Sequence, residues 1–274
     1  MRAKKAHVLF SYSQINQYLR CPRSYRCRYL DGWEERESRP AKAFGRSFEK
    51  ALAACFSGDD GGAVFFKEWA AFGNAAFEYK TGESWDRLFH QGIHLLERFV
   101  REDRVRIVSP QENLQVKLLR KLPGGHEFVA YLDAVGAVDG ERRIIDWKTT
   151  TSRYEEAPQD LLSLDPQLIC YSWMSGIAEV ALVVFVRKRQ PEIQYLKASI
   201  SDEHRQEFGQ LVEATIAQIE AARFPSHSGI RFPRNGCVSC SHLGLCLENQ
   251  ELIDLHLTRK SGASDLDWLD ELMV

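Results

Sequence analysis

The feature that most constrains the fold is a two-residue turn, Asp139-Gly140, set between two apolar stretches. Asp-Gly flanked by strand-forming residues is a strong signal for a tight β-hairpin, because both turn positions need positive φ. If these two residues form the loop, Val138 faces Glu141 and paired positions sum to 279. The sequence therefore predicts two antiparallel strands with a defined register.

Two acidic side chains meet in that register, because Asp133 falls opposite Asp146. Directly opposed side chains have Cβ atoms about 5 Å apart, and like charges there are unfavourable. A divalent cation would relieve the repulsion. Lys148 shares the face of Asp146 and would reach a phosphate or a water at that ion. From the pattern alone, solvated acids and a surface lysine on an edge hairpin remain the alternative.

The segment LDPQLICYSWMSG, residues 164–176, predicts a helix capped by Asp165 and ended by Gly176. Gln167 then lies in the first turn, where free N–H groups favour an anion, and Tyr171 lies one turn further on the same face. This pair would position a phosphodiester beside the metal. A half-buried tyrosine on an amphipathic helix is the alternative.

The remaining pattern indicates a mixed α/β chain. Apolar residues at helical spacing predict helices within residues 11–30, 41–104 and 202–222, and alternating runs predict strands within 113–200. With 274 residues, 44% of them hydrophobic, the chain can bury a sizeable core. No apolar run is long enough to span a bilayer, and we expect no signal peptide.

The charge and the cysteine content limit which binding partners and which cellular compartment are expected. The net charge is −2, so the chain as a whole is not a basic nucleic-acid coat, although residues 1–54 hold twelve Lys/Arg against five Asp/Glu. Seven cysteines without a secretory signal indicate a reducing compartment, and we expect a cytoplasmic protein.

A group of cysteines near the C-terminus has metal-ligand spacing, Cys-x2-Cys-x5-Cys, at Cys237, Cys240 and Cys246. The fourth candidate is Cys21, more than 200 residues upstream, with Cys27 as its possible substitute. Four thiolates could hold zinc or an iron–sulfur cluster, and the spacing leaves both open.

These motifs together resemble the PD-(D/E)XK nuclease superfamily, most closely the RecB-type nuclease domain and its relatives in AddB and in CRISPR-associated cluster-bearing nucleases. The residues that carry the resemblance are Asp133, Asp146 and Lys148 in IDWKT, and Gln167 and Tyr171 in QLICY. The resemblance implies an α/β fold with a restriction-endonuclease-like mixed sheet flanked by helices, an added N-terminal helical region and a C-terminal cysteine segment.

The family's first motif is only partly present. In the family, a glycine is followed three residues later by a metal-binding histidine; this sequence has Gly45 but carries Phe48 at the histidine position. Phenylalanine cannot bind a metal, so the site loses one expected ligand. Glu49, next in the chain, is the expected replacement, and a weakened site is the alternative.

The resemblance also implies a domain plan. It favours a 4Fe–4S cluster held by Cys21, Cys237, Cys240 and Cys246, and a single iron–sulfur nuclease domain over residues 1–256. That domain divides into a cluster arm, a helical region, a nuclease core and a cysteine segment, at 1–40, 41–104, 105–224 and 225–256. The acidic residues 257–274 would follow as a tail that docks a protein partner, or as an ordinary frayed terminus.

The implied activity is phosphodiester hydrolysis by a Mg²⁺- or Mn²⁺-dependent DNA exonuclease or end-processing nuclease, in recombination, repair or CRISPR adaptation. Asp133, Asp146 and Glu49 would hold the metal, while Lys148 would orient the attacking water or neutralise the phosphate. The DNA would be single-stranded or have free ends. The alternative is a catalytically weakened or inactive nuclease-fold subunit that binds DNA within a larger complex.

Four arginines flank the first cluster cysteine and alternate with tyrosines. Interleaved basic and aromatic residues suit a single-strand channel, through phosphate contacts and base stacking. A solvated arginine face is the alternative. The expected DNA-binding residues are Arg20, Arg23, Arg26 and Arg28.

Overall fold

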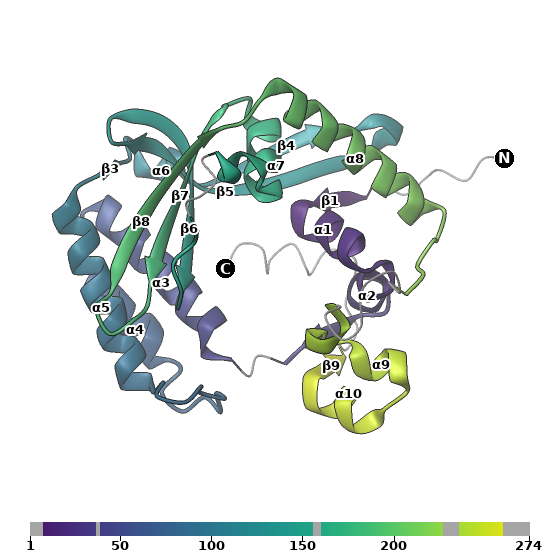
Figure 1. The fold of residues 1–274 in the computed structure, drawn as a ribbon, viewed down its shortest axis with the longest axis horizontal. Helices are drawn as coiled ribbons and strands as arrows, with labels where there is room; N and C mark the ends of the chain where they lie inside the picture. The colour runs from purple at the N-terminus through teal and green to yellow at the C-terminus, as the bar shows by residue number, and fades with distance from the viewer. Residues whose placement is uncertain (1–7, 37–38, 156–159, 227–235, 260–274) are drawn as a thin grey trace. The chain divides into compact units, whose positions relative to one another are not determined.

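The computed structural model describes residues 8–36, 39–155, 160–226 and 236–259 (Figure 1). The chain forms two compact units. The central unit comprises residues 37–119 and 130–208, and the terminal unit comprises residues 1–36, 120–129 and 209–274. Most of the predicted acidic tail, residues 260–274, lies outside the described residues. No helix in the described ranges has the length and apolarity to cross a membrane.

The central unit is built on a mixed sheet. Its strands are β3 (Val105–Arg106), β4 (Leu114–Lys121), β5 (Glu127–Val138), β6 (Glu141–Thr150), β7 (Glu179–Val186) and β8 (Glu192–Ser199). The order β5-β6-β7-β8 combines an antiparallel pair, a parallel pair and a second antiparallel pair, and β3 and β4 also pair with β5. The first residues of β5 and the last of β4 belong to the terminal unit.

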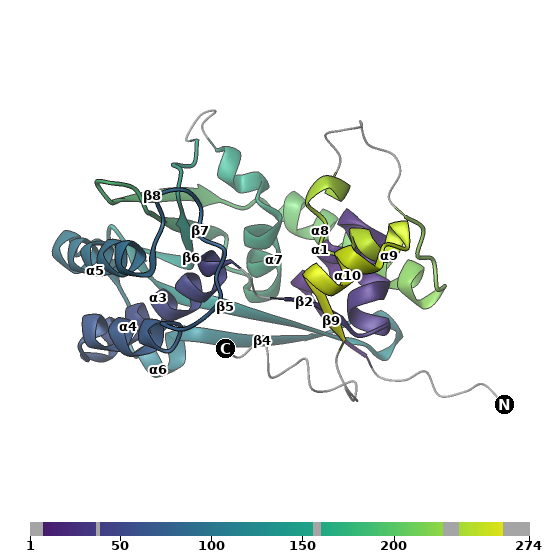
Figure 2. The ribbon, with the colours of Figure 1, turned by 90° about the horizontal axis from the view of Figure 1, so that it is seen from below.

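Helices cover both faces of this sheet (Figures 1 and 2). One face packs against α3 (Pro40–Ser57), α4 (Gly61–Ala70) and α5 (Trp85–Glu102), through a core rich in aromatic rings. The other face packs against α7 (Pro166–Ser175), whose Leu168 and Tyr171 contact apolar residues of β7. The predicted mixed α/β sheet flanked by helices is confirmed.

The predicted hairpin has the expected register. Pairing runs from Val138 opposite Glu141 to Ala134 opposite Ile145, so paired positions sum to 279. Asp139 and Gly140 have φ of +53° and +86°, as a two-residue hairpin loop requires.

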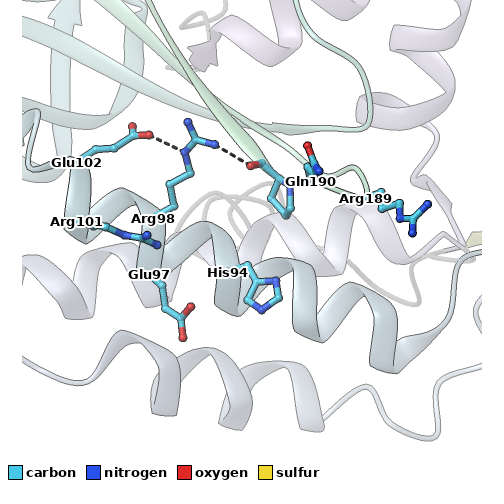
Figure 3. A pocket seen from close by; sticks show the side chains of 8 residues that line it. His94, Glu97, Arg98, Arg101, Glu102, Arg189 and Gln190 are labelled. Atoms are coloured by element: carbon cyan, nitrogen blue, oxygen red, sulfur yellow. Dashed lines mark hydrogen bonds and ion pairs between the residues drawn. The ribbon is translucent and has the colours of Figure 1, made fainter.

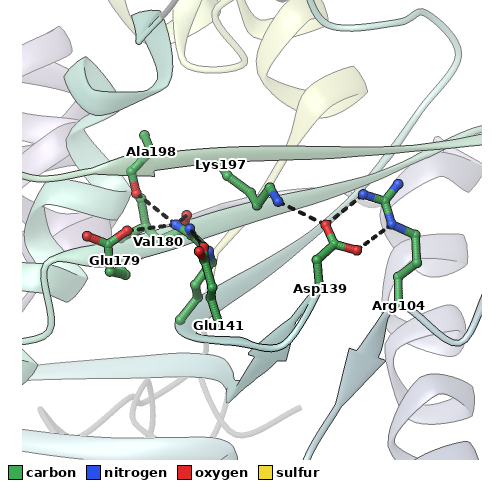
Figure 4. Close-up of polar contacts among 8 residues, drawn as sticks. Arg104, Asp139, Glu141, Glu179, Val180, Lys197 and Ala198 are labelled. Atoms are coloured by element: carbon green, nitrogen blue, oxygen red, sulfur yellow. Dashed lines mark hydrogen bonds and ion pairs between the residues drawn. The ribbon is translucent and has the colours of Figure 1, made fainter.

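Charged contacts fix the turn end of the sheet (Figure 4). The Asp139 carboxylate accepts two hydrogen bonds of 2.7 Å from Arg104 and one of 2.9 Å from Lys197, which together hold its pKa well below the usual range. The buried guanidinium of Arg143 donates to Glu179 at 2.8 Å and to the Val180 and Ala198 carbonyls. These contacts tie β5, β6, β7 and β8 together.

One helix is shorter than expected. The apolar spacing of residues 63–77 predicts a helix throughout, but α4 ends at Ala70 and the chain turns. Gly73 and Asn74 have low helix propensity, which favours this early end. A short helix α6 (Pro110–Asn113) and the four-residue 3₁₀ turn Leu161–Leu164 complete the described elements of the central unit.

The terminal unit joins segments from both ends of the chain. Its elements are β1 (Leu9–Ser11), α1 (Tyr12–Arg20), α2 (Pro22–Tyr25), a π-helical turn (Arg26–Leu30), β2 (Trp33–Glu35), α9 (Leu243–Leu247), α10 (Gln250–His256), β9 (Leu257–Arg259) and the second part of α8 (Asp202–Glu220). β1 pairs in parallel with the start of β5, and β2 pairs antiparallel with β9 (Figure 2). Ser11 caps α1, accepting from the Gln14 N–H.

Candidate active site

Strand β6 carries a buried carboxylate and a lysine on the face that α7 covers. Asp146 is only 1% exposed, and Lys148 is half-buried. The Lys148 Nζ lies 2.7 Å from Asp146 Oδ2 and donates to Gln167 Oε1 at 3.0 Å. The lysine therefore links the strand to the first turn of the helix.

Helix α7 extends the same contact network. The Gln167 Nε2 donates to the Tyr171 hydroxyl at 2.6 Å, one helical turn away. The Asp165 Oδ1 caps the helix, accepting from the Gln167 and Leu168 N–H groups at 2.9 and 3.0 Å. The helix start is therefore fixed, and the side chains of Asp146, Lys148, Gln167 and Tyr171 form one connected set.

Asp133 lies at the point where β5 and β6 separate. The described ladder ends with Ala134 opposite Ile145, so Asp133 and Asp146 would be the next pair in the same register. Instead of a backbone pair, the Asp133 Oδ2 accepts a 2.8 Å hydrogen bond from the Trp147 N–H. Burial raises the pKa of Asp133 well above its usual value, and the charges of Asp146 and Glu49 raise it further.

Asp146 has unused hydrogen-bonding capacity. Its Oδ1 is buried and has no hydrogen-bond partner among the described residues. Burial raises the pKa of this carboxyl group, while Lys148 acts in the opposite direction. For Lys148 itself, burial lowers the pKa, but the pairing with Asp146 and the charges of Asp133 and Asp165 outweigh it, so the net pKa is raised.

Helix α3 separates the roles of Phe48 and Glu49. Phe48 is 1% exposed and its ring centroid lies 4.7 Å from that of Phe185, inside the aromatic core. Glu49 is half-buried. Burial is the main cause that raises its pKa, and the charge of Asp146 raises it further, so Glu49 lies within electrostatic reach of that aspartate. Gln115 Nε2 donates to Glu49 Oε1, a contact that sequence reasoning missed because the two residues are 66 positions apart.

The donor chemistry of this site suits a hard divalent cation. Carboxylate oxygens are the ligands that Mg²⁺ and Mn²⁺ prefer, and the partnerless Asp146 Oδ1 offers one. Within the described ranges, no group of three or more His, Cys, Asp or Glu side chains stands in a metal-holding arrangement.

Comparison with known families decides the class of the chain. The sequence model of the PD-(D/E)XK nuclease superfamily matches residues 9–247. The chain belongs to this superfamily. A nuclease fold implies a nucleic acid substrate, and members of the superfamily usually use divalent metals.

One solved structure supports the fold of this superfamily member. The crystal structure of a "Putative exonuclease" from Eubacterium rectale is 17% identical, with a TM-score of 0.54 over 95% of this chain and 92% of that chain. The crystal structure of SSO0001 is also 17% identical, with a TM-score of 0.39 over 89% of this chain and 88% of that chain. A comparison with curated proteins found no match.

The predicted cluster cysteines of this superfamily member all lie in the terminal unit. Burial raises the pKa of Cys240, and the thiols of Cys21, Cys246 and Cys237 raise it further, so each of the three lies within electrostatic reach of Cys240. Among the described residues the four do not stand in a metal-holding arrangement. The His242 backbone N–H donates to the Cys240 sulfur. Burial raises the pKa of Cys27 to about 11, and Cys246 and Cys21 also contribute. Cys27 is therefore a neighbour of the predicted set.

The four predicted DNA-binding arginines, Arg20, Arg23, Arg26 and Arg28, are exposed on the terminal unit. Arg26 lies 3.4 Å from Asp31, and Arg28 lies over the Tyr29 ring. The interleaved tyrosines behave differently from the expectation. Tyr18 and Tyr25 are buried and pack against each other, so their faces are not open to bases.

Proposed function

We propose that this protein is a metal-dependent deoxyribonuclease that hydrolyses phosphodiester bonds at Asp133, Asp146 and Lys148. The observation that carries the proposal is the connected set on β6 and α7: a buried carboxylate with a partnerless oxygen, paired with a lysine that also contacts Gln167. A structural protein gains little from such a group, because a buried charge costs stability.

The residues divide the work of hydrolysis. Asp133 and Asp146 would hold Mg²⁺ or Mn²⁺, with Glu49 as a further carboxylate. A bound divalent cation lowers the pKa of a coordinated water and stabilises charge on the phosphate. Lys148 keeps its positive charge at neutral pH because its pKa is raised, so it offers an ammonium to a phosphate oxygen or to the attacking water.

Helix α7 supplies the positioning groups. The pKa of Tyr171 is raised by burial and then by the charges of Asp146 and Asp133, so its hydroxyl stays neutral. Gln167 lies between that hydroxyl and Lys148 and fixes the direction of both. We infer that Gln167 and Tyr171 orient the ammonium toward the substrate. The name of the Eubacterium rectale relative favours exonucleolytic digestion.

The test is a cleavage assay with labelled single-stranded and double-stranded DNA in Mg²⁺ or Mn²⁺, using anaerobically purified full-length protein. We expect Asp146→Asn and Lys148→Met to lower the rate by about 100-fold or more. The matched controls are Asp59→Asn and Lys67→Met, two exposed positions on the α3–α4 side. Cleavage that survives both site variants would refute the assigned site.

An inactive protein would point to the other candidate. No cleavage in any metal, together with tight binding to DNA, would identify a nuclease-fold DNA-binding subunit. The separate burial of Phe48 and placement of Glu49 favour the enzyme, because the missing histidine leaves a carboxylate near the aspartates.

We propose further that Cys21, Cys237, Cys240 and Cys246 hold a 4Fe–4S cluster. Three thiols within electrostatic reach of the Cys240 thiol, and a backbone N–H donated to the Cys240 sulfur, support this proposal, because thiolates are the soft donors that such a cluster needs. Joining residues 21 and 246 would close a very long loop and restrict the unfolded chain. The exposed arginines nearby would contact DNA phosphates.

A further inference from the structure

A cavity lies beside the proposed catalytic residues, on the α7 face of the central sheet. Its volume is ≈ 520 Å³, within the range of small-molecule sites. Its lining includes Leu182, which pairs with Asp146 in the β6–β7 ladder. Paired residues on neighbouring strands lie about 5 Å apart and face the same side. The cavity therefore begins one strand away from the buried carboxylate.

The walls of the cavity are mostly apolar and partly open to solvent. Leu161, Leu164 and Tyr154 line it and are 46%, 56% and 40% exposed. The leucines belong to the 3₁₀ turn before α7, and Leu182 and Leu196 form the floor. Apolar side chains at this exposure beside a catalytic site offer a surface for a flat, uncharged group.

The polar residues of the cavity exclude an anion as its occupant. Glu155 and Asp165 contribute two carboxylates, against the single guanidinium of Arg153. That guanidinium is already 3.2 Å from the Glu192 carboxylate. A phosphate group would meet net negative charge here, whereas a neutral nucleobase has apolar faces for the walls and amino groups for the acids.

Tyr154 is held in place at the cavity by its backbone. The buried Gln194 accepts from the Tyr154 N–H at 2.9 Å and donates to the Tyr154 carbonyl at 3.0 Å. This clamp fixes the backbone of Tyr154 at the place where the residue lines the cavity. Asp165, which also lines the cavity, accepts from the Gln167 N–H, and the Gln167 side chain accepts from Lys148, so a strand with its phosphate at Lys148 would have an adjoining base near this cavity.

We propose that this cavity binds one unpaired nucleobase of single-stranded DNA, next to the phosphate that is cut, with the Tyr154 ring stacking on the base. The proposal rests on the proposed function and adds a substrate class to it. A base in a duplex is stacked and paired and cannot enter a cavity, so the enzyme acts on unpaired DNA.

A second cavity of ≈ 550 Å³ does not meet the same conditions (Figure 3). It lies along α5 and the β7–β8 turn, on the helix-covered face opposite α7. Its lining mixes acids and arginines, and Arg98 is bound to Glu102 at 2.6 Å and to the Pro191 carbonyl at 3.0 Å. Nothing there connects it to Asp146 and Lys148.

The experiment measures binding of a fluorescein-labelled oligonucleotide by anisotropy, with Asp146→Asn protein so that the DNA stays intact. We expect Tyr154→Ala to weaken binding of single-stranded DNA by about 5-fold to 150-fold, and Tyr154→Phe to leave it within about 2-fold. Loss of binding in Tyr154→Phe as well would overturn stacking. A duplex of the same sequence should bind without sensitivity to either change.

A scan of abasic sites through the oligonucleotide tests the contact directly. In the protein that retains Tyr154, one abasic position should weaken DNA binding as much as Tyr154→Ala does. In the Tyr154→Ala protein, the same abasic position should not weaken binding further. Equal losses in both proteins at every position would overturn the proposal. Leu164→Glu, which adds a third carboxylate at the cavity mouth, should reproduce the loss; unchanged binding would contradict it.

Hydrolysis of a base-free diester, an oligonucleotide built entirely of abasic sugar residues, separates the two proposals. Failure of the unsubstituted protein to cleave either this compound or DNA would refute the proposed function. Cleavage of both, with equal losses for both in Tyr154→Ala, would refute only the base-binding cavity. We expect Tyr154→Ala to slow DNA cleavage and to leave diester cleavage unchanged.

Discussion

The ammonium of Lys148 lies 2.7 Å from the Oδ2 of Asp146, and that carboxylate is almost fully buried. The pair places one positive and one negative group on the same strand face, two residues apart. Each member stabilises the charged form of the other against burial. Removing one member therefore leaves a buried charge without its partner.

Lys148→Met is the first prediction. We expect DNA cleavage to fall by about 100-fold or more and the protein to become less stable, because Asp146 loses its counter-charge. Adding Asp146→Asn should recover stability but not cleavage, since the double variant has no buried unpaired charge. Thermal unfolding and cleavage rates measure the two effects. A double variant less stable than Lys148→Met would contradict this account.

The pKa of Asp133 gives the second prediction. Its value in the folded protein is raised well above the ordinary 3.8, mainly by burial. As the pH rises above 3.8, the unfolded chain releases this proton first, so the raised pKa lowers stability at neutral pH. Asp133→Asn removes that cost, and its side-chain carbonyl can still accept from the Trp147 N–H.

We therefore expect metal-free Asp133→Asn to melt about 2–4 °C higher at pH 7, the shift that about 1 kcal/mol gives in a domain of this size. The gain should shrink as the pH falls and vanish near 3.8. Melting curves across this range in a chelator measure it. Added Mg²⁺ should stabilise the unsubstituted protein more than the variant; equal stabilisation would remove Asp133 from the proposed metal ligands.

Much of the candidate site follows from local sequence rules. The Asp139-Gly140 turn sets the register that brings Asp133 to Asp146, and strand alternation puts Lys148 on the same face. The cap at Asp165 fixes the start of α7. These relations depend on residues close in the chain, where turn chemistry and periodicity decide geometry.

Contacts between segments that are far apart in the chain could not be predicted from the sequence. Gln115 donates to Glu49 although three helices and a strand separate them in the chain, and no periodicity encodes that contact. The burial of Tyr18 and Tyr25 has the same origin, because Phe224 and Arg223 cover them from a segment 200 residues away. From the sequence alone, a tyrosine flanked by arginines is expected to be exposed, because the distant segment that covers it is not known.

The cysteines give a third prediction. Anaerobically purified protein should be brown, absorb near 400 nm and contain iron rather than zinc. Cys21→Ser and Cys240→Ser should each remove the colour, whereas Cys27→Ser should retain it, because Cys27 is a neighbour rather than a member of the proposed set. Metal analysis and absorption spectra measure this. Stoichiometric zinc without iron would replace the cluster by a zinc site.

The neighbouring residues Phe48 and Glu49 give the last prediction. Restoring the family histidine by Phe48→His should not increase cleavage, because position 48 points into the aromatic core against Phe44 and Phe185. A buried imidazole there loses ring packing and lacks a partner, so we expect a loss of about 3 kcal/mol or more. Phe48→Leu should cost less and retain cleavage.

Glu49→Gln should change the metal requirement of cleavage rather than the stability of the protein. It keeps the shape of the side chain but removes a carboxylate within electrostatic reach of the two aspartates, so the Mg²⁺ concentration for half-maximal cleavage should rise at least about 10-fold, while the melting temperature stays constant or increases. Metal titrations of the cleavage rate provide the measurement. If Phe48→His instead lowered the Mg²⁺ requirement, the helix would have to rotate to bring position 48 to the metal, and Glu49 could no longer be its replacement. The burial of Phe48 beside Phe185 makes that rotation costly, because it would expose an aromatic ring and empty its place in the core.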